Sequence, residues 1–218
     1  MLTLKKTYLQ VENGGHLSYG GCQMRSDQAA IRKCGCGPVA ALDLLHYLTD
    51  AEGCAPLPSA QYNEELRFLC RRYFPLIPNS GINGLMLCIG VNRLFRDRGL
   101  PYRTVWAASG EKLWERIREM LEHDLPVILS VGPNFPAVWE KEKLRFYIRH
   151  PNGCFRPAVS TRSHYISVTG MDDDWLRISS WGREYYISRR EYEEYVRRHS
   201  AYLFSNILYI QHIKSSDS

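Results

Sequence analysis

Long apolar runs are absent from this 218-residue sequence. No stretch approaches the ~20 consecutive apolar residues that a membrane-spanning helix needs. The segment from Met1 to Thr7 also lacks the apolar core of a secretory signal peptide. Together these absences predict a cytoplasmic protein with no membrane partner.

Internal repeats and low-complexity segments are missing as well, so a single domain over residues 1–218 is the simplest organisation. A chain of this length can bury a sizeable core, and 44% hydrophobic residues is typical of a globular protein. The seven cysteines are an odd number, and several fall in helical apolar patterns. We interpret them as free thiols in a reducing compartment rather than as a disulfide framework.

The excess of positive charge is too small for a typical nucleic-acid-binding protein. The net charge is +5, and most of this excess lies between Ala137 and Ser163, where six Lys or Arg accompany two Glu. A nucleic-acid interface usually has a denser basic stripe with interleaved aromatic side chains, so no nucleic-acid partner is expected. Residues 132–163 are too long for a plain connection. We expect them to form an irregular functional loop whose basic part favours acidic substrates.

The order of the expected elements predicts an α+β fold. Helical patterns dominate about residues 1–124, and strand patterns dominate about residues 125–218, which is typical of helices packed on an antiparallel sheet. The expected helices cover residues 38–48, 63–73, 80–98 with Ser80 as cap, 109–123 and 188–198. The expected strands cover residues 102–106, 126–131, 164–169, 175–179, 184–187 and 203–213.

A cysteine stands at the start of the most apolar of these helices. Cys36-Gly37-Pro38 leads into a run from Val39 to Leu48 whose apolar residues return at three- and four-residue spacing. Pro38 suits the first turn, where its missing N–H costs nothing. The free N–H groups and the dipole at this end favour a thiolate, the nucleophilic form of cysteine. Cys36 is therefore the candidate nucleophile.

A histidine opens an apolar strand far downstream of this helix. His164 heads the segment His164-Tyr-Ile-Ser-Val168, and a ring at this position can point into a cleft. Cysteine at a helix start with histidine on a later strand is the arrangement of a thiolate–imidazolium pair. The far nitrogen of such a histidine needs an orienting partner. The next strand ends at Ser179, which in a hairpin would lie near the ring.

Three short motifs resemble the papain-like cysteine peptidase fold, above all the bacteriocin-processing "double-glycine" peptidases and their free-standing relatives. The motifs are Cys36-Gly-Pro-Val-Ala40 at a helix start, His164-Tyr-Ile-Ser-Val-Thr-Gly170 in a strand, and Ser179-Ser-Trp-Gly182 after the next strand. The resemblance spans residues 20–187 in outline. It implies a papain-like α+β fold in which the nucleophile helix packs on a C-terminal antiparallel sheet. It also implies that Cys36 is the nucleophile and His164 the base.

The orienting residue departs from the pattern of this family. The family has Asp or Asn there, and the matching position is Ser179, whose hydroxyl can accept a hydrogen bond from imidazole but supplies no charge. A backbone carbonyl or one of Asp172 to Asp174 could serve instead.

The oxyanion glutamine departs from the pattern too. Relatives place it some six residues before the cysteine, whereas Gln28 lies eight and Gln23 thirteen residues before Cys36. The glycine pair Gly20-Gly21 ahead of Gln23 would allow a close approach to the site. Gln23 is therefore the expected oxyanion residue, with Gln28 as the alternative.

Other interpretations of the cysteines stay open. Gln28 has the family spacing to Cys34, although the helix begins where a nucleophile at Cys36 would need it. His16, Cys22, Cys34 and Cys36 could instead form a zinc site, although one residue between paired cysteines fits structural zinc poorly. Cys36 could also be only a small buried hydrophobe.

The preferred interpretation is a cysteine-dependent hydrolase acting on a peptide or related amide. The Cys36 thiolate would attack the carbonyl, and the Cys36 N–H and a glutamine amide would hold the oxyanion. His164 would protonate the leaving amine, and water would cleave the thioester. This chemistry needs no cofactor and no metal. The rival classes are an acyltransferase that passes the acyl group to an amine, and a non-catalytic binding module, for which the serine at position 179 is the best hint.

Overall fold

The computed structural model describes residues 1–50, 55–77, 81–108 and 110–213. The helices are α1 (Ala29–Cys34), α2 (Cys36–Thr49), α3 (Ser59–Arg72), α4 (Gly84–Asp97), α5 (Leu113–Glu122) and α6 (Arg189–His199), with the 3-10 turns η1 (Gln23–Arg25) and η2 (Gly110–Lys112). The strands are β1 (Leu2–Thr3), β2 (Gln10–Asn13), β3 (His16–Tyr19), β4 (Leu57–Pro58), β5 (Tyr102–Trp106), β6 (Val127–Val131), β7 (Leu144–Arg149), β8 (Phe155–Thr161), β9 (His164–Met171), β10 (Trp175–Ser180), β11 (Arg183–Ser188) and β12 (Ile207–His212).

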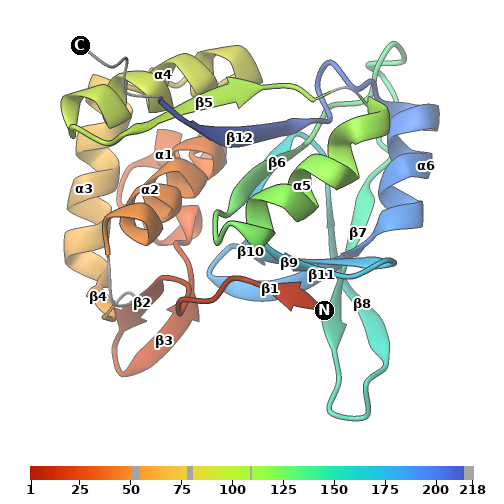
Figure 1. Cartoon of the computed structure of the whole chain (residues 1–218), viewed down its shortest axis with the longest axis horizontal. Helices are drawn as coiled ribbons and strands as arrows, with labels where there is room; N and C mark the ends of the chain where they lie inside the picture. The colour runs from red at the N-terminus through yellow and green to blue at the C-terminus, as the bar shows by residue number, and fades with distance from the viewer. Residues whose placement is uncertain (51–54, 78–80, 109, 214–218) are drawn as a thin grey trace.

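A large antiparallel sheet organises the molecule. Its strands follow the order β5-β12-β6-β9-β10-β11-β7-β8, and β1 pairs with β9 beside this path. A small sheet of order β3-β2-β4 stands apart from it. Figure 1 shows α1 to α4 gathered on one side of the large sheet, while α5 lies across it and α6 flanks β7. The expected mixture of helices and antiparallel sheet is confirmed, and its papain-like character stays a prediction.

The two expected halves of the chain share this sheet. Strand β5, from the first half, pairs with β12 over five residues, from Leu208 opposite Trp106 to His212 opposite Tyr102. Helix α6 lies in the second half, where Ser188 caps it by accepting a hydrogen bond from the Glu191 N–H. The boundary near residue 125 therefore describes the order of elements along the chain and not two separate layers.

Helix α2 lies at the centre of the packing. It contacts β9 on one side and α3 and α4 on the others, and Ala41 and Leu42 on it are fully buried. A hydrogen bond of 2.8 Å between His46 Nε2 and a Glu65 carboxylate oxygen links it to α3. The helix is apolar almost all round because it is enclosed by other elements, as expected for a buried helix.

Several boundaries differ from those expected. Helix α4 begins at Gly84, where the Asn83 side chain accepts a hydrogen bond from the Met86 N–H and caps the helix. The expected cap Ser80 lies outside the described residues, as does Ser109. Helix α3 begins four residues earlier than expected, at Ser59.

The expectation of an irregular loop over residues 132–163 was wrong, because this segment contains the β7–β8 hairpin. Strand β7 alternates in its first residues, with Leu144 and Phe146 buried and Arg145 exposed. The turn contains Asn152-Gly153, with Gly153 at φ +85°. An Asn-Gly pair between alternating segments is a strong hairpin signal, and it could have predicted this element.

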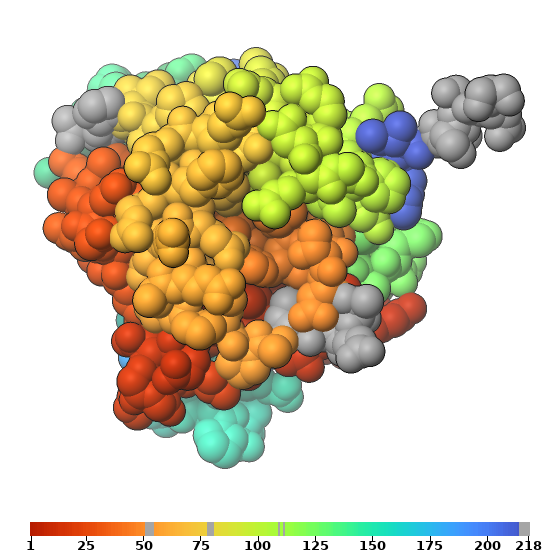
Figure 2. All heavy atoms as spheres, turned by 90° about the vertical axis from the view of Figure 1, so that its left-hand side faces the viewer, coloured from red at the N-terminus to blue at the C-terminus, as the bar shows by residue number. Residues whose placement is uncertain are grey.

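A cavity of about 240 Å³ lies on the helical side, away from the sheet. Its lining residues come from α2 and α3 and from Arg98 at the end of α4. They include apolar side chains such as Leu42 and Phe68 and the acidic Glu64 and Glu65. Figure 2 shows this face, with α3 and α4 side by side and α2 visible between them. None of the sequence-predicted site residues lines this cavity. Within the described ranges, no helix combines the length and the apolar character needed to cross a bilayer.

Candidate active site

Cys36 is the first residue of α2. Gly35 stands at the N-cap position, and the Val39 N–H donates to the Gly35 carbonyl to close the first turn. Cys36 is half-buried. Burial raises the pKa of its thiol, while hydrogen bonding from the backbone of Tyr165, Gly37 and Cys36 itself acts in the opposite direction. The helix start therefore places the sulfur at the free N–H groups as expected, but the net shift of the pKa is opposite to the predicted one.

His164 is the first residue of β9 and is buried, with 6% of its surface exposed. Its Nε2 atom lies 2.8 Å from the Ser180 hydroxyl oxygen. The indole of Trp181 stacks on the imidazole with ring centroids 4.3 Å apart. Burial lowers the pKa of His164 to about 3. The two shifts, upward for Cys36 and downward for His164, both favour a thiol beside a neutral imidazole. The thiolate–imidazolium pair stays a prediction.

The partner of the imidazole is Ser180 and not Ser179, which corrects the expected position by one residue. Ser179 pairs with Ser167 in the β9–β10 ladder, so its side chain lies on the face opposite to that of Ser180 and His164. Its hydroxyl donates to the Tyr19 carbonyl at 2.7 Å. Ser179 holds a neighbouring chain segment, while Ser180 contacts the ring.

Trp181 and Gly182 form the two-residue turn between β10 and β11. Both have positive φ, +50° for Trp181 and +74° for Gly182, as a type I′ hairpin turn requires. A tryptophan in this region is a genuine outlier, because its bulky side chain disfavours positive φ. The conformation directs the indole onto His164, where it covers one face of the base. Strain of this kind is often found at functional sites.

Gln23 lies in the pocket and Gln28 does not. Gln23 is 7% exposed and begins η1, and its side-chain Nε2 donates to the Arg32 carbonyl at 3.0 Å. Gln28 is exposed at the N-cap position of α1. The second N–H of the Gln23 amide group leaves one donor beyond the bond to Arg32. Of the two glutamines, only Gln23 is placed near Cys36.

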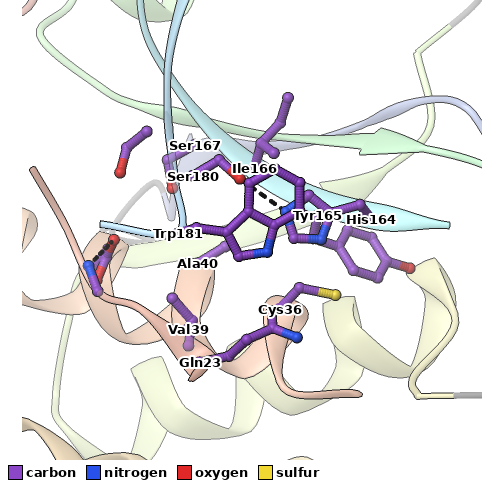
Figure 3. Close-up of a pocket in the computed structure, with 13 residues that line it drawn as sticks. Gln23, Cys36, Val39, Ala40, His164, Tyr165, Ile166, Ser167, Ser180 and Trp181 are labelled. Atoms are coloured by element: carbon purple, nitrogen blue, oxygen red, sulfur yellow. Dashed lines mark hydrogen bonds between the residues drawn. The ribbon is translucent and has the colours of Figure 1, made fainter. Parts of the chain in front are cut away.

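One small pocket brings these residues together. Its lining includes Gln23, Cys36, His164, Ser179 and Ser180, and its free volume is about 10 Å³, comparable to the space for a single water molecule. Figure 3 shows Cys36 and Gln23 on one side of this space and the His164 ring, covered by Trp181, on the other. Among the described residues, no hydrogen bond joins the Cys36 sulfur to His164.

Cys34 lies outside this pocket, at the end of α1. Six cysteines in the described part of the chain are free thiols. No group of three or more His, Cys, Asp or Glu side chains in that part is arranged as metal ligands, so His16, Cys22, Cys34 and Cys36 do not form the alternative zinc set there.

Two of the cations in the basic segment 137–163 bind other groups of the protein. Arg145 forms an ion pair of 2.6 Å with Glu191 on α6, and Arg162 donates to the Asn134 side chain and the Glu140 carbonyl. These two cations stabilise the loop and the hairpin. The preference for acidic substrates stays a prediction.

Sequence reasoning missed Asp43, which also lines the pocket. This residue is 2% exposed and lies two helical turns after Cys36 on α2. The signal was present, because a lone acid inside the apolar run Val39 to Leu48 is rarely buried without a set of partners.

Comparisons with known proteins add one likeness. No family model matches the sequence, and no curated protein matches it either. A solved structure described as a "putative C39-like peptidase from Bacillus anthracis" is similar, with a TM-score of 0.48 and 12% sequence identity, over 90% of this chain and 94% of that chain. A likeness of this size assigns neither a family nor a function to this chain.

Proposed function

We propose that this protein is a cysteine-dependent hydrolase of papain-like type that cleaves a peptide or related amide at Cys36. One observation carries the proposal: Cys36, His164 and Gln23, from three separate elements, line a single pocket, with Ser180 on the far nitrogen of the imidazole. Each group has a distinct role in acyl transfer.

Attack begins from the neutral pair. For His164 Nδ1 to accept a proton, the ring must carry its hydrogen on Nε2 and donate it to the Ser180 hydroxyl. The Cys36 sulfur then forms a bond to the substrate carbonyl carbon as its proton passes to Nδ1. The carbonyl oxygen takes up the electron pair, and the Cys36 N–H and the free Gln23 N–H stabilise the resulting negative charge.

Breakdown of this intermediate restores the site. The C–N bond breaks and the imidazolium returns its proton to the leaving amine, which leaves a thioester on Cys36. Water then attacks the thioester carbon while His164 accepts a proton from the water. The C–S bond then breaks, the acid is released, and the imidazolium returns its proton to the sulfur, which regenerates the thiol.

A trapping experiment tests this function. The protein is treated with p-nitrophenyl acetate, quenched in acid, and digested so that mass spectrometry can locate the acetyl group. We expect a thioester on Cys36 that His164→Ala removes and that Cys34→Ala leaves unchanged. An acetyl group spread over the cysteines in proportion to their exposure, or one that is unaffected by His164→Ala, would contradict the proposal.

A binding module of the same fold is the second candidate. It is favoured by the pKa shifts toward a neutral pair and because, within the described ranges, the hydrogen-bond partner of the His164 ring is the uncharged Ser180. It predicts an unacetylated Cys36. Acyl transfer is separated from hydrolysis by adding an amine such as glycinamide, because only an acyltransferase converts the thioester mainly to the amide.

A further inference from the structure

Asp43 is a buried acid that the proposed chemistry does not use. It lies on the same face of α2 as Cys36, because seven residues are two turns of an α-helix. An acid with 2% exposure needs hydrogen-bond donors, since transfer of an unpaired carboxylate from water into the protein interior is strongly unfavourable. The identity of its donors shows what the carboxylate holds in place.

Three donors from three segments meet at this carboxylate. The Gly21 N–H donates to both oxygens, at 3.0 and 3.1 Å. The Tyr62 hydroxyl on α3 donates at 2.7 Å, and the Tyr8 hydroxyl at 3.3 Å. Hydrogen bonds to a charged acceptor are about twice as strong as those between neutral groups. Asp43 thus joins the nucleophile helix to the chain segment that precedes Gln23.

The glycines of this segment fit the carboxylate closely. A Cβ atom on Gly20, at φ +76°, would lie 2.5 Å from an Asp43 oxygen and 2.3 Å from the Ser179 hydroxyl oxygen. A Cβ on Gly21 would lie 1.9 Å from the Tyr62 hydroxyl oxygen. The backbone here is therefore enclosed between Asp43 on the helix side and Ser179 on the sheet side.

The segment that contains Gly20 and Gly21 also contacts the β10–β11 hairpin, which carries Ser180 and Trp181 beside His164. The Tyr19 N–H donates to the Gly182 carbonyl at 2.9 Å, and the Tyr19 carbonyl accepts from Ser179. Gln23 follows Gly21 by two residues. The segment from Tyr19 to Gln23 thereby links α2 to the β10–β11 turn, and Asp43 supplies its anchor on the α2 side.

We propose that Asp43 is a positioning residue: its carboxylate holds the Gly20–Gly21 backbone and so fixes Gln23 in the cleft beside Cys36. The consequence for chemistry rests on the proposed function, because it requires Gln23 to stabilise an oxyanion. The anchoring of the Gly20–Gly21 backbone by Asp43 does not depend on the proposed function. The titratable groups that face the carboxylate are Tyr8, Tyr62 and His46.

The test separates anchoring from chemistry. Asp43→Asn keeps the size of the side chain, but only one of its two terminal atoms is an oxygen that can accept a hydrogen bond. Asn92→Ala is the matched control, because the Asn92 side chain likewise holds a backbone segment, at the Thr104 N–H (2.6 Å) and carbonyl (3.0 Å), and does not line the pocket. Hydrogen exchange of the Gly21 amide and the NMR shifts of the Gln23 side-chain amide report the anchoring.

Chemistry is read separately, with ¹³C-labelled N-acetylglycinal as the probe. The Cys36 thiol adds across the aldehyde to give a hemithioacetal, whose oxygen occupies the oxyanion position. Because loss of one oxyanion donor commonly weakens catalysis by about a hundredfold or more, we expect Asp43→Asn to weaken aldehyde capture at least tenfold. Alkylation of Cys36 by iodoacetamide, which forms no oxyanion, should stay close to wild type.

Faster Gly21 exchange and shifted Gln23 signals in Asp43→Asn, with neither change in Asn92→Ala, would support the proposal. Unchanged Gly21 exchange and Gln23 signals in a folded Asp43→Asn would overturn it. If this variant does not fold, Tyr62→Phe removes one partner of the carboxylate and is judged by the same signals. If the wild-type protein captures no aldehyde, the proposed function fails, and the exchange data alone decide the anchoring.

Discussion

Asp43 and His164 are two buried ionisable groups that line one pocket, and burial disfavours the charged form of each to a different extent. Burial raises the pKa of Asp43 to about 6, and bonds from Tyr62 and Gly21 limit the shift. Burial lowers the pKa of His164 to about 3. Among the residues that the structure describes, the carboxylate has three hydrogen-bond donors, whereas the imidazole has one neutral hydroxyl partner. The comparison teaches that the supply of partners decides how far desolvation moves a pKa.

The largest expected effect is acid destabilisation through His164. Its folded pKa of about 3 lies below the unfolded value near 6.5, so the unfolded chain binds more protons between these values. Stability is full above about pH 6.5 and is lost as the pH falls toward 3, by roughly 4–5 kcal/mol at 1.36 kcal/mol per pKa unit. Urea unfolding from pH 3 to 7 should show that His164→Gln is relatively more stable at the acid end. A constant difference between the two proteins would contradict the low pKa.

Asp43 should give a slope of the opposite sign. Its folded pKa of about 6 lies above the unfolded value near 3.8, so the folded protein binds the extra proton. The stability that this group supplies is full below about pH 4 and is lost as the pH rises through 6, by about 3 kcal/mol. Compared by urea unfolding over the same range, Asp43→Asn should lack this decline. Parallel curves for variant and wild type would show that Asp43 does not titrate in this window.

Tyr62→Phe sharpens the comparison by removing one donor from the carboxylate. We expect a loss of about 1.5–3 kcal/mol in the free energy of unfolding, typical of a hydrogen bond to a charged group. Because the Tyr62 bond lowers the pKa of Asp43, its loss should raise that pKa and extend the decline in stability to higher pH. NMR titration of the Asp43 carboxyl carbon measures the shift directly, and an unchanged midpoint would argue against the bond.

The smallest effect on stability is expected from the two serines, about 1 kcal/mol for each hydrogen bond removed. Ser180→Ala should alter the ¹⁵N shifts of the His164 ring, because Nε2 loses its hydrogen-bond partner. Ser179→Ala should leave these shifts unchanged and affect the Tyr19 segment instead. The reverse pattern would restore the assignment that the sequence favoured.

The local motifs were predictable because they depend on short-range chemistry. Pro38 and the apolar run that follows place Cys36 at a helix start, and an alternating apolar segment places His164 on a strand. The choice between Ser179 and Ser180 was not predictable in this way. It depends on strand register, and a register shift between Arg177 and Ile178 changes which residues of β9 and β10 share a face.

Asp43 and Gln23 show a second limit. Their importance comes from the fold, which brings Gly21, Tyr62 and Tyr8 to one carboxylate across separations of 19 to 35 residues. Helical periodicity places Asp43 on the face of Cys36 but cannot name its partners. The spacing between glutamine and cysteine was similarly uninformative, because Gln23 begins η1 and α1 lies between this turn and Cys36.

The stacking of Trp181 on His164 also has an optical consequence. An imidazolium accepts an electron from an excited indole far more readily than a neutral imidazole does, so protonation of the ring quenches tryptophan fluorescence. With the ring centroids 4.3 Å apart, the share of Trp181 in the fluorescence of the five tryptophans depends on the charge of the His164 ring. Substrate binding or attack by Cys36 that places a proton on His164 would thus decrease the tryptophan fluorescence, and no added label is needed to measure it.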